Sequence, residues 1–279
     1  MKFMLTASIV LYKTAVEELH TILNAALQSS IASVFVLDNS PTDDLKAEVA
    51  AHQSAKLTYI HGQGNVGYGR AHNIAIQESI RLGAKYHIIL NPDIVFQAGD
   101  IDGLMKFMDQ SPQVGAVMPN IIYPDGTPQR LCKLLPTPMD IFSRRLLPKS
   151  WIQSRNQKYE MHFMGYNQVW NCPNLSGCFM FLRMEVLKQI GGFDDRFFMY
   201  FEDTDLIRQI HRRSLTVFYP DVTIVHAHKA EHRTNRVLLK ISIESAIKYF
   251  NKYGWFFDKE RRLFNRRAKQ GRVLSTHSY

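Results

Sequence analysis

Three acidic residues, Glu202, Asp203 and Asp205, follow directly on an aromatic run in the segment GGFDDRFFMYFEDTDL, residues 191–206. Aromatic surroundings desolvate a carboxylate and disfavour its charged form. A fold tolerates such acids where they meet a metal ion, a cation or a proton that must move, so the segment is a candidate catalytic site. The structural alternative is an acidic first helical turn that complements the helix dipole.

A second carboxylate ends an apolar run further upstream. Asn91-Pro92-Asp93 follows the sequence YHIIL. Oxygen donors of this kind suit Mg²⁺ or Mn²⁺, which usually bind a diphosphate as well. Taken by itself, the tripeptide is more typical of a simple Asx-Pro turn.

Two histidines, His226 and His228, end another apolar run. Alternate residues of a strand project to the same face, so the pair could complete a metal site or bind phosphate. A structural role is an equally good interpretation of these two residues by themselves.

A glycine-rich segment, residues 62–73, has the pattern GxGxxGxG. A dinucleotide-binding fingerprint should follow the first strand, but this segment follows the third, so NAD binding is rejected. We expect a loop whose backbone approaches a nucleotide, with the polar contacts Asn65, Arg70, His72 and Asn73. The alternative is a strand-to-helix connection whose glycines, Gly67 among them, adopt left-handed conformations.

The first half of the chain alternates apolar, β-rich runs with segments of helical periodicity. This alternation predicts an α/β fold with a mostly parallel sheet flanked by helices. Ligands of such sheets bind beyond the carboxyl ends of the strands, where Asp38 and Asn91 are expected. The expected strands are residues 7–12, 33–37, 57–61 and 86–90, and the expected helices are 16–27, 43–51 and 71–82.

The second half is less regular. Residues 119–139 hold five of the eleven prolines and predict a loop. Residues 143–164 are polar and basic and predict a mobile segment. The expected strands here are 114–118, 175–182, 216–219 and 223–225, and the expected helices are 185–190, 203–213 and 237–250.

Composition limits the class of protein. The 279 residues are 46% hydrophobic, which is ample for a core, and no run approaches ~18 apolar residues, so no membrane-spanning helix is expected. The N-terminus predicts a first strand rather than a signal peptide. The three cysteines match no zinc spacing and predict reduced thiols in a cytoplasmic protein.

The charge is concentrated in the C-terminal tail. Residues 229–272 contain thirteen Lys and Arg against four Asp and Glu, so this segment carries the whole formal charge of +9. A basic tail on a neutral body suggests an anionic partner, either lipid headgroups or nucleic acid. Six aromatic residues lie among the bases, which suits a helix at a membrane interface. They are Tyr249, Phe250, Tyr253, Trp255, Phe256 and Phe257.

Taken in order, these motifs resemble family 2 glycosyltransferases with the GT-A fold, from about residue 6 to residue 228. The matching segments are FVLDNS (35–40), GNVGYGRAHNIAI (64–76), LNPDI (90–94), LSGCFMFLR (175–183), GGFDDRFFMYFEDTDLIRQ (191–209) and VFYPDVTIVHAH (217–228). The forms LNPD and FFMYFEDTDL and the basic tail look most like bacterial rhamnosyltransferases of O-antigen and other surface polysaccharides. The resemblance implies a GT-A catalytic domain at 1–228 and a basic helical extension at 229–279.

The resemblance also implies roles for individual residues. Asp203 would be the catalytic base, with Glu202 beside it, and Asp93 and His226 would hold Mg²⁺ or Mn²⁺. Asn91 replaces an Asp found in many relatives, which should weaken metal binding. The implied nucleotide-sugar contacts are Thr6, Tyr12, Asp38, Asn65, Gly67, Arg70, His72, Asn73 and Asn91.

The implied reaction is a single inverting displacement. A metal would offset the charge of the departing diphosphate while Asp203 takes the proton of the acceptor hydroxyl. The implied donor is dTDP-L-rhamnose, and the implied acceptor is a saccharide or lipid-linked saccharide at the inner face of the cell membrane. The alternatives are the same fold with a UDP-sugar donor, a catalytically inactive scaffold, or a nucleic-acid-binding protein. The acids that would line the groove have the wrong sign for a phosphate backbone.

Overall fold

The structure is a computed structural model that describes residues 4–146, 148–227 and 236–271. Its strands are β1 (Leu5–Leu11), β2 (Ser33–Asp38), β3 (Leu57–Ile60), β4 (Tyr86–Leu90), β5 (Ile94–Val95), β6 (Val114–Ile122), β7 (Trp170–Asn171), β8 (Phe179–Arg183) and β9 (Leu215–His226). Its helices are α1 (Val16–Gln28), α2 (Lys46–Ala51), α3 (Tyr68–Arg81), α4 (Ala98–Gln110), α5 (Pro138–Leu146), α6 (Lys149–Tyr159), the 3₁₀ turn η1 (His162–Met164), α7 (Met184–Ile190), α8 (Glu202–His211), α9 (Arg236–Tyr253) and α10 (Lys259–Lys269).

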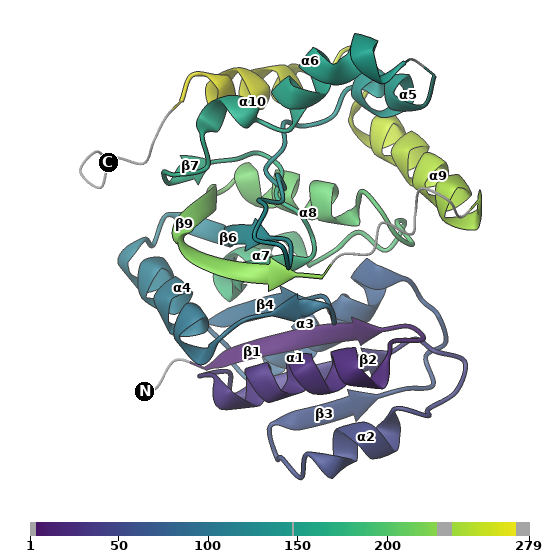
Figure 1. Ribbon diagram of the computed structural model, residues 1–279, viewed down its shortest axis with the longest axis vertical. Helices are drawn as coiled ribbons and strands as arrows, with labels where there is room; N and C mark the ends of the chain where they lie inside the picture. Colours follow the sequence, from purple (N-terminus) through teal and green to yellow (C-terminus); the bar gives the residue numbers. More distant parts are fainter. Residues whose placement is uncertain (1–3, 147, 228–235, 272–279) are drawn as a thin grey trace.

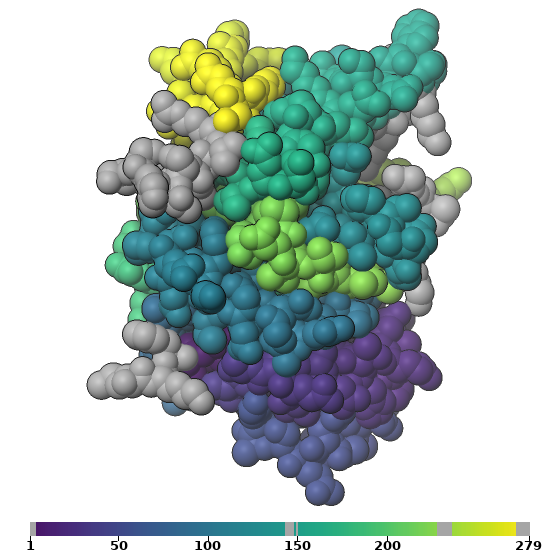
Figure 2. Space-filling model, turned by 60° about the vertical axis from the view of Figure 1, so that its left-hand side comes forward, coloured from purple at the N-terminus to yellow at the C-terminus, as the bar shows by residue number. Residues whose placement is uncertain are grey.

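The nine described strands form one sheet, in the order β3-β2-β1-β4-β8-β6-β9-β5, with β7 also paired to β9. Helices cover the sheet, and α5, α6 and α10 lie together at one end of the molecule (Figure 1). The space-filling view shows the same arrangement, with α10 in yellow beside the teal α5–α6 segment (Figure 2). Six strands run in one direction, and β5, β7 and β8 run against them. The predicted α/β fold with a mostly parallel sheet is therefore confirmed.

Strand register brings the predicted polar clusters to one edge of the sheet. Leu11 pairs with Asp38, and Ile9 pairs with Leu90, so β1, β2 and β4 end close to the same level. Strand β8 runs in the opposite direction, and its first residue, Phe179, pairs with Leu90. The start of β8 therefore meets the ends of the parallel strands at this edge.

The second half is more ordered than its sequence suggests. Strand β6 continues through Pro119 to Ile122, although a loop was expected from residue 119 onward. A register shift between Pro119 and Asn120 accommodates the proline, which cannot donate a ladder hydrogen bond. The prediction of a mobile polar segment at 143–164 is wrong, because α5, α6 and η1 form there. The two strands expected at 216–219 and 223–225 form the single strand β9.

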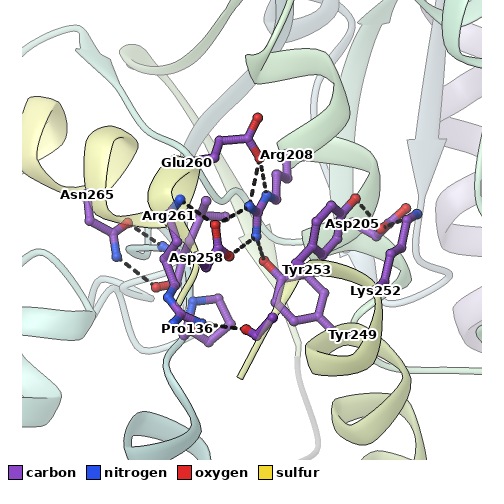
Figure 3. A network of polar contacts seen from close by, with 12 residues as sticks. Pro136, Asp205, Arg208, Tyr249, Lys252, Tyr253, Asp258, Glu260, Arg261 and Asn265 are labelled. Atoms are coloured by element: carbon purple, nitrogen blue, oxygen red, sulfur yellow. Dashed lines mark hydrogen bonds and ion pairs between the residues drawn. The ribbon is translucent and has the colours of Figure 1, made fainter. Parts of the chain in front are cut away.

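Helices α9 and α10 of the predicted extension pack on the body of the protein. Tyr249 and Phe250 are fully buried in a cluster with Phe197. The Arg208 guanidinium of α8 is 1% exposed and makes two hydrogen bonds of 2.7 and 2.8 Å to Asp258 (Figure 3). None of the helices that the structure describes is both long and apolar enough to span a membrane.

Candidate active site

The acidic segment begins with a strained turn. Tyr200 and Phe201 have φ angles of 68° and 66°, in the left-handed region that non-glycine residues rarely adopt. Backbone strain of this kind persists only where the surroundings enforce it, and it concentrates at functional sites. Phe197 is buried against α9, and the Phe198 carbonyl accepts a hydrogen bond from the Tyr68 N–H at 2.9 Å. Contacts with α9 and with Tyr68 thus hold residues 200–201 in place. They position the first turn of α8 at the edge of the sheet.

Asp203 is fixed in the first turn of α8 by neutral donors. Its Oδ2 accepts from the Gly177 N–H at 3.0 Å, and its Oδ1 accepts from the Thr204 N–H at 2.7 Å. A Cβ atom at position 177 would lie 3.0 Å from the Asp203 Cβ, so a glycine permits this close approach. Gly177 immediately precedes Cys178, whose carbonyl accepts from the Asn91 N–H. Asp203 therefore lies at the edge where β4 ends and β8 begins.

Glu202 differs from its neighbour in burial. It is 5% exposed, and its Oε2 has no hydrogen-bond partner. Burial, followed by the nearby Asp203 carboxylate, raises the pKa of Glu202 well above its usual value. Burial therefore favours the neutral form of the Glu202 carboxyl, whereas Asp203 is only partly buried.

Asp93 and His226 meet across the same edge. Their Oδ1 and Nε2 atoms are 3.2 Å apart, because β5 pairs Ile94 with His226. Gln129 fixes the imidazole by accepting from Nδ1 at 2.9 Å and donating to the His226 carbonyl at 2.7 Å. Burial alone would lower the pKa of His226, but Asp93 and Cys178 raise it, to about 10. His228 lies outside the described residues.

These residues suit a shared metal site rather than a complete protein cage. The part of the chain that the structure describes contains no group of three or more His, Cys, Asp and Glu side chains able to hold a metal. Asp93 would supply one ligand, and His226 would supply a second only after the metal displaces the proton from its imidazole. Mg²⁺ is commonly held by one or two carboxylates, with substrate phosphates and water completing its shell. The donor set thus fits a divalent ion that binds together with a diphosphate.

The nucleoside end of the predicted site lies beside β2. Asp38 is 1% exposed, and its oxygens accept from the Ser40 N–H at 2.9 Å and the Tyr59 hydroxyl at 2.7 Å. Burial and then Asp38 raise the pKa of Tyr59, which stays a phenol. Tyr12 is 49% exposed just beyond the end of β1. Asn65 and Arg70 are exposed in the glycine-rich segment and remain available to a ligand.

Four expected nucleotide contacts are instead engaged within the protein. Thr6 lies at the start of β1, away from the ligand edge, and is fully buried with bonds to Ser79 and His87. His72 is also fully buried, 2.7 Å from the Ser8 hydroxyl. The predictions of direct contact for Thr6 and His72 are therefore wrong.

Gly67 and Asn73 both hold the acidic segment in contact with α3. A Cβ on Gly67 would lie 2.2 Å from the Phe198 carbonyl oxygen, so this glycine packs on the turn before α8. The Asn73 amide bonds to both the N–H and the C=O of Phe193, and to Asp195. Both residues hold the acidic segment against α3, and the nucleotide contacts expected at these two positions stay predictions.

Sequence reasoning missed two side chains at the site, Tyr68 and Gln129. The Tyr68 hydroxyl lies 2.9 Å from Asn91 Oδ1 and 2.8 Å from the Gly177 carbonyl, and so links the loop to β4 and β8. Burial, then Cys178, Glu202 and Asp203, raise the pKa of Tyr68 well above its usual value. Gln129 lies in the proline-rich segment 119–139, which the sequence predicted to be a loop, and no residue of this segment was predicted to belong to the site. Only the aromatic ring between two glycines could have drawn attention to Tyr68.

Comparison with known proteins places this site in context. Residues 9–191 match "Glycosyl transferase family 2", and residues 160–233 match "N-terminal domain of galactosyltransferase". An N-acetylglucosaminyl-diphospho-decaprenol L-rhamnosyltransferase of Mycobacterium tuberculosis is 30% identical over 73% of this chain and 68% of its own length. Rhamnosyltransferase WbbL of Escherichia coli K12 is 26% identical over 73% of this chain and 74% of its own.

A solved structure supports the fold alone. Mannosyltransferase PcManGT from Pyrobaculum calidifontis, in complex with GDP-Man and Mn²⁺, is 17% identical and superposes with a TM-score of 0.59. The match covers 88% of this chain and 64% of that one.

Proposed function

Because the chain belongs to glycosyl transferase family 2, we propose that it is an inverting glycosyltransferase that moves L-rhamnose from dTDP-L-rhamnose to a saccharide or lipid-linked saccharide in surface polysaccharide synthesis. Two relatives with rhamnosyltransferase names support the choice of sugar. The observation that carries the proposal is the meeting of Asp203, Asn91 and the Asp93–His226 pair at one edge of the sheet.

The donor would lie along this edge. Its base would approach Tyr12 and Asp38 at the ends of β1 and β2, and its diphosphate would approach Asp93 and His226. A divalent cation bound there would offset the negative charge of the departing diphosphate. His226, held by Gln129, would face the phosphates with its Nε2 atom.

The acceptor hydroxyl would lose its proton to Asp203. A base must come within hydrogen-bond reach of the proton that it takes, and Asp203, held by the Gly177 N–H at 3.0 Å, would meet the acceptor hydroxyl at this edge. Glu202, held neutral by burial, would not compete for the proton. Attack opposite the leaving diphosphate inverts the anomeric centre, and no covalent intermediate with the protein is required.

Thermal unfolding with nucleotide sugars tests the donor. A true donor stabilises the folded state by mass action, so dTDP-L-rhamnose should raise the melting temperature more than UDP-galactose, UDP-galactofuranose or UDP-N-acetylglucosamine. Product analysis with the best donor should then show an inverted linkage. A larger shift with a UDP-sugar would replace the donor assignment, and no shift with any nucleotide sugar would overturn the proposed function.

A further inference from the structure

The surface of interest is the outward side of α10, which borders a cavity of about 390 Å³. The cavity lies apart from the candidate active site, and no carboxylate lines it. Its lining residues are Thr137, Arg261, Arg262, Asn265, Arg266, Lys269 and Gln270. Burial and the neighbouring Lys158 ammonium lower the pKa of Lys269, and the Asp140 carboxylate opposes them only in part.

Three exposed cations share this side because of helical spacing. Arg262, Arg266 and Lys269 lie at intervals of four and three residues, which places them on one face of α10. The buried Arg261 instead turns inward and donates to the carbonyls of Pro136 and Trp255. The face thus consists of exposed cations on one helix.

Two exposed aromatic side chains adjoin these cations. Phe256 is 68% exposed and Phe257 is 87% exposed, in the connection between α9 and α10. The Arg262 guanidinium donates to the Phe256 carbonyl at 3.3 Å, so the apolar and cationic groups are neighbours. The other four aromatics of the tail are not available, because Tyr249 and Phe250 are buried and Tyr253 and Trp255 pack against their cluster.

Buried ion pairs hold helices α9 and α10 against the body of the protein, so they are not free to lie along a membrane as a separate helix. The Arg208–Asp258 pair is buried, and Glu260 also bonds to Arg208 (Figure 3). Glu260 makes a further ion pair with Arg212. Breaking a buried ion pair by removing one partner is strongly destabilising. The outward side of α10 and the adjoining Phe residues stay exposed and can meet an external partner.

We propose that the outward side of α10 and the adjoining phenyl rings form a docking face for anionic lipid headgroups. The docking face consists of Arg262, Arg266, Lys269, Phe256 and Phe257. This proposal rests on the proposed function in one respect, which is that a lipid-linked acceptor would lie at the membrane. The cations would bind headgroup phosphates, with the cavity receiving one of them. The phenyl rings would enter the boundary between headgroups and acyl chains. A single-stranded nucleic acid could also bind these cations and stack its bases on the Phe rings, and the test below separates it from lipid.

The test is co-sedimentation of full-length protein with vesicles of phosphatidylcholine alone and of equal parts phosphatidylcholine and phosphatidylglycerol. The triple variant Arg262→Glu, Arg266→Glu, Lys269→Glu should lose binding to the anionic vesicles by on the order of 100-fold, because each base contributes a factor of about five near such a surface. Phe256→Ser with Phe257→Ser should lose at least about tenfold. The matched control Lys46→Glu, Lys106→Glu, Lys188→Glu makes the same change in charge on the exposed surfaces of α2, α4 and α7 and should lose much less.

The outcomes separate this docking face from the proposed function. The rate of sugar transfer to a soluble acceptor should stay unchanged in the triple variant and the double Phe variant, because the substituted residues contact no residue of the candidate active site. Equal loss of vesicle binding in the matched control would overturn the docking face. Wild-type binding by both the triple variant and the double Phe variant would also overturn it. Displacement of the protein from vesicles by inorganic phosphate at low concentration would assign the cavity to free phosphate instead. Tighter binding to polyuridylate than to vesicles, lost in the triple variant, would assign the face to nucleic acid.

Discussion

Helix α8 carries two groups of acids that differ in their partners. Asp205 is fully buried and bonds to the Lys252 ammonium and the Tyr253 hydroxyl, each at 2.6 Å. Asp203 receives only neutral donors, and Glu202 leaves one buried oxygen without a partner. Asp205, with its cationic and hydroxyl partners, holds the tail, and the acids without cations lie at the edge proposed for catalysis. The hydrogen-bond partners of these carboxylates, rather than their residue types, distinguish the structural acid from the candidate catalytic acids.

The largest expected effect is on turnover in Asp203→Asn. Removal of a positioned base should lower kcat by about 10²–10⁴-fold, while the melting temperature and donor affinity stay near those of the wild type. The matched control is Asp205→Asn, the same change two residues along the helix, which should lower stability more than it lowers kcat in the folded enzyme. Turnover above a tenth of wild type in Asp203→Asn would refute the assignment of the base.

The next effect is on folding stability in Asp258→Ala. This change leaves the Arg208 guanidinium buried without its bidentate partner, which should reduce the free energy of unfolding by about 3–5 kcal/mol. Urea denaturation followed by circular dichroism measures the loss. The exposed acid Asp102, changed to Ala, serves as the control and should alter stability little. A loss below about 1 kcal/mol, as for an exposed ion pair, would mean that the network does not anchor the tail.

A smaller effect is expected on donor binding in Asp93→Ala. Loss of this carboxylate should weaken nucleotide-sugar affinity about tenfold or more and remove most of the response to Mg²⁺ or Mn²⁺. Calorimetry with and without EDTA measures both quantities. Nucleotide affinity that is unchanged by the substitution and by the chelator would disprove the metal role of Asp93.

The smallest effect concerns the pH dependence of stability in Glu202→Gln. Since the pKa of Glu202 is raised in the folded state, the folded protein holds a proton that the unfolded chain releases above about pH 4.5. Stability should therefore fall as pH rises from there toward the folded-state pKa. Glutamine has no such proton, so the stability of the variant should gain on that of the wild type as pH rises from 5 to 8. A constant difference between the two proteins across this range would contradict a buried neutral Glu202.

Much of the site was predictable because its signals are local. Apolar runs followed by polar residues marked the ends of β2, β4 and β9, and Asp38, Asn91 and His226 lie there. The acidic segment could be recognised from its aromatic neighbours. The contact between Asp93 and His226 was expected only as a consequence of the family pattern, and the register of β5 on β9 produces it.

The errors arose where burial depends on distant segments. Thr6 and His72 are polar residues in promising sequence positions, but neighbouring strands and helices enclose them. Tyr68 and Gln129 gain their roles from partners far along the chain, which no local pattern reveals. The pairing of Asp258 with Arg208 spans fifty positions.

The sequence by itself determined the alternation of strands and helices, the acids and histidine of the candidate site and the basic character of the tail, because periodicity and composition act over short stretches of chain. Only the tertiary structure decided which polar residues reach the ligand edge and which aromatics of the tail face outward. Tyr249 and Phe250 are buried and Phe256 and Phe257 are exposed, although all four are similar in the sequence. The reason is that burial is a property of packing between segments, and packing is settled only when the whole chain has folded.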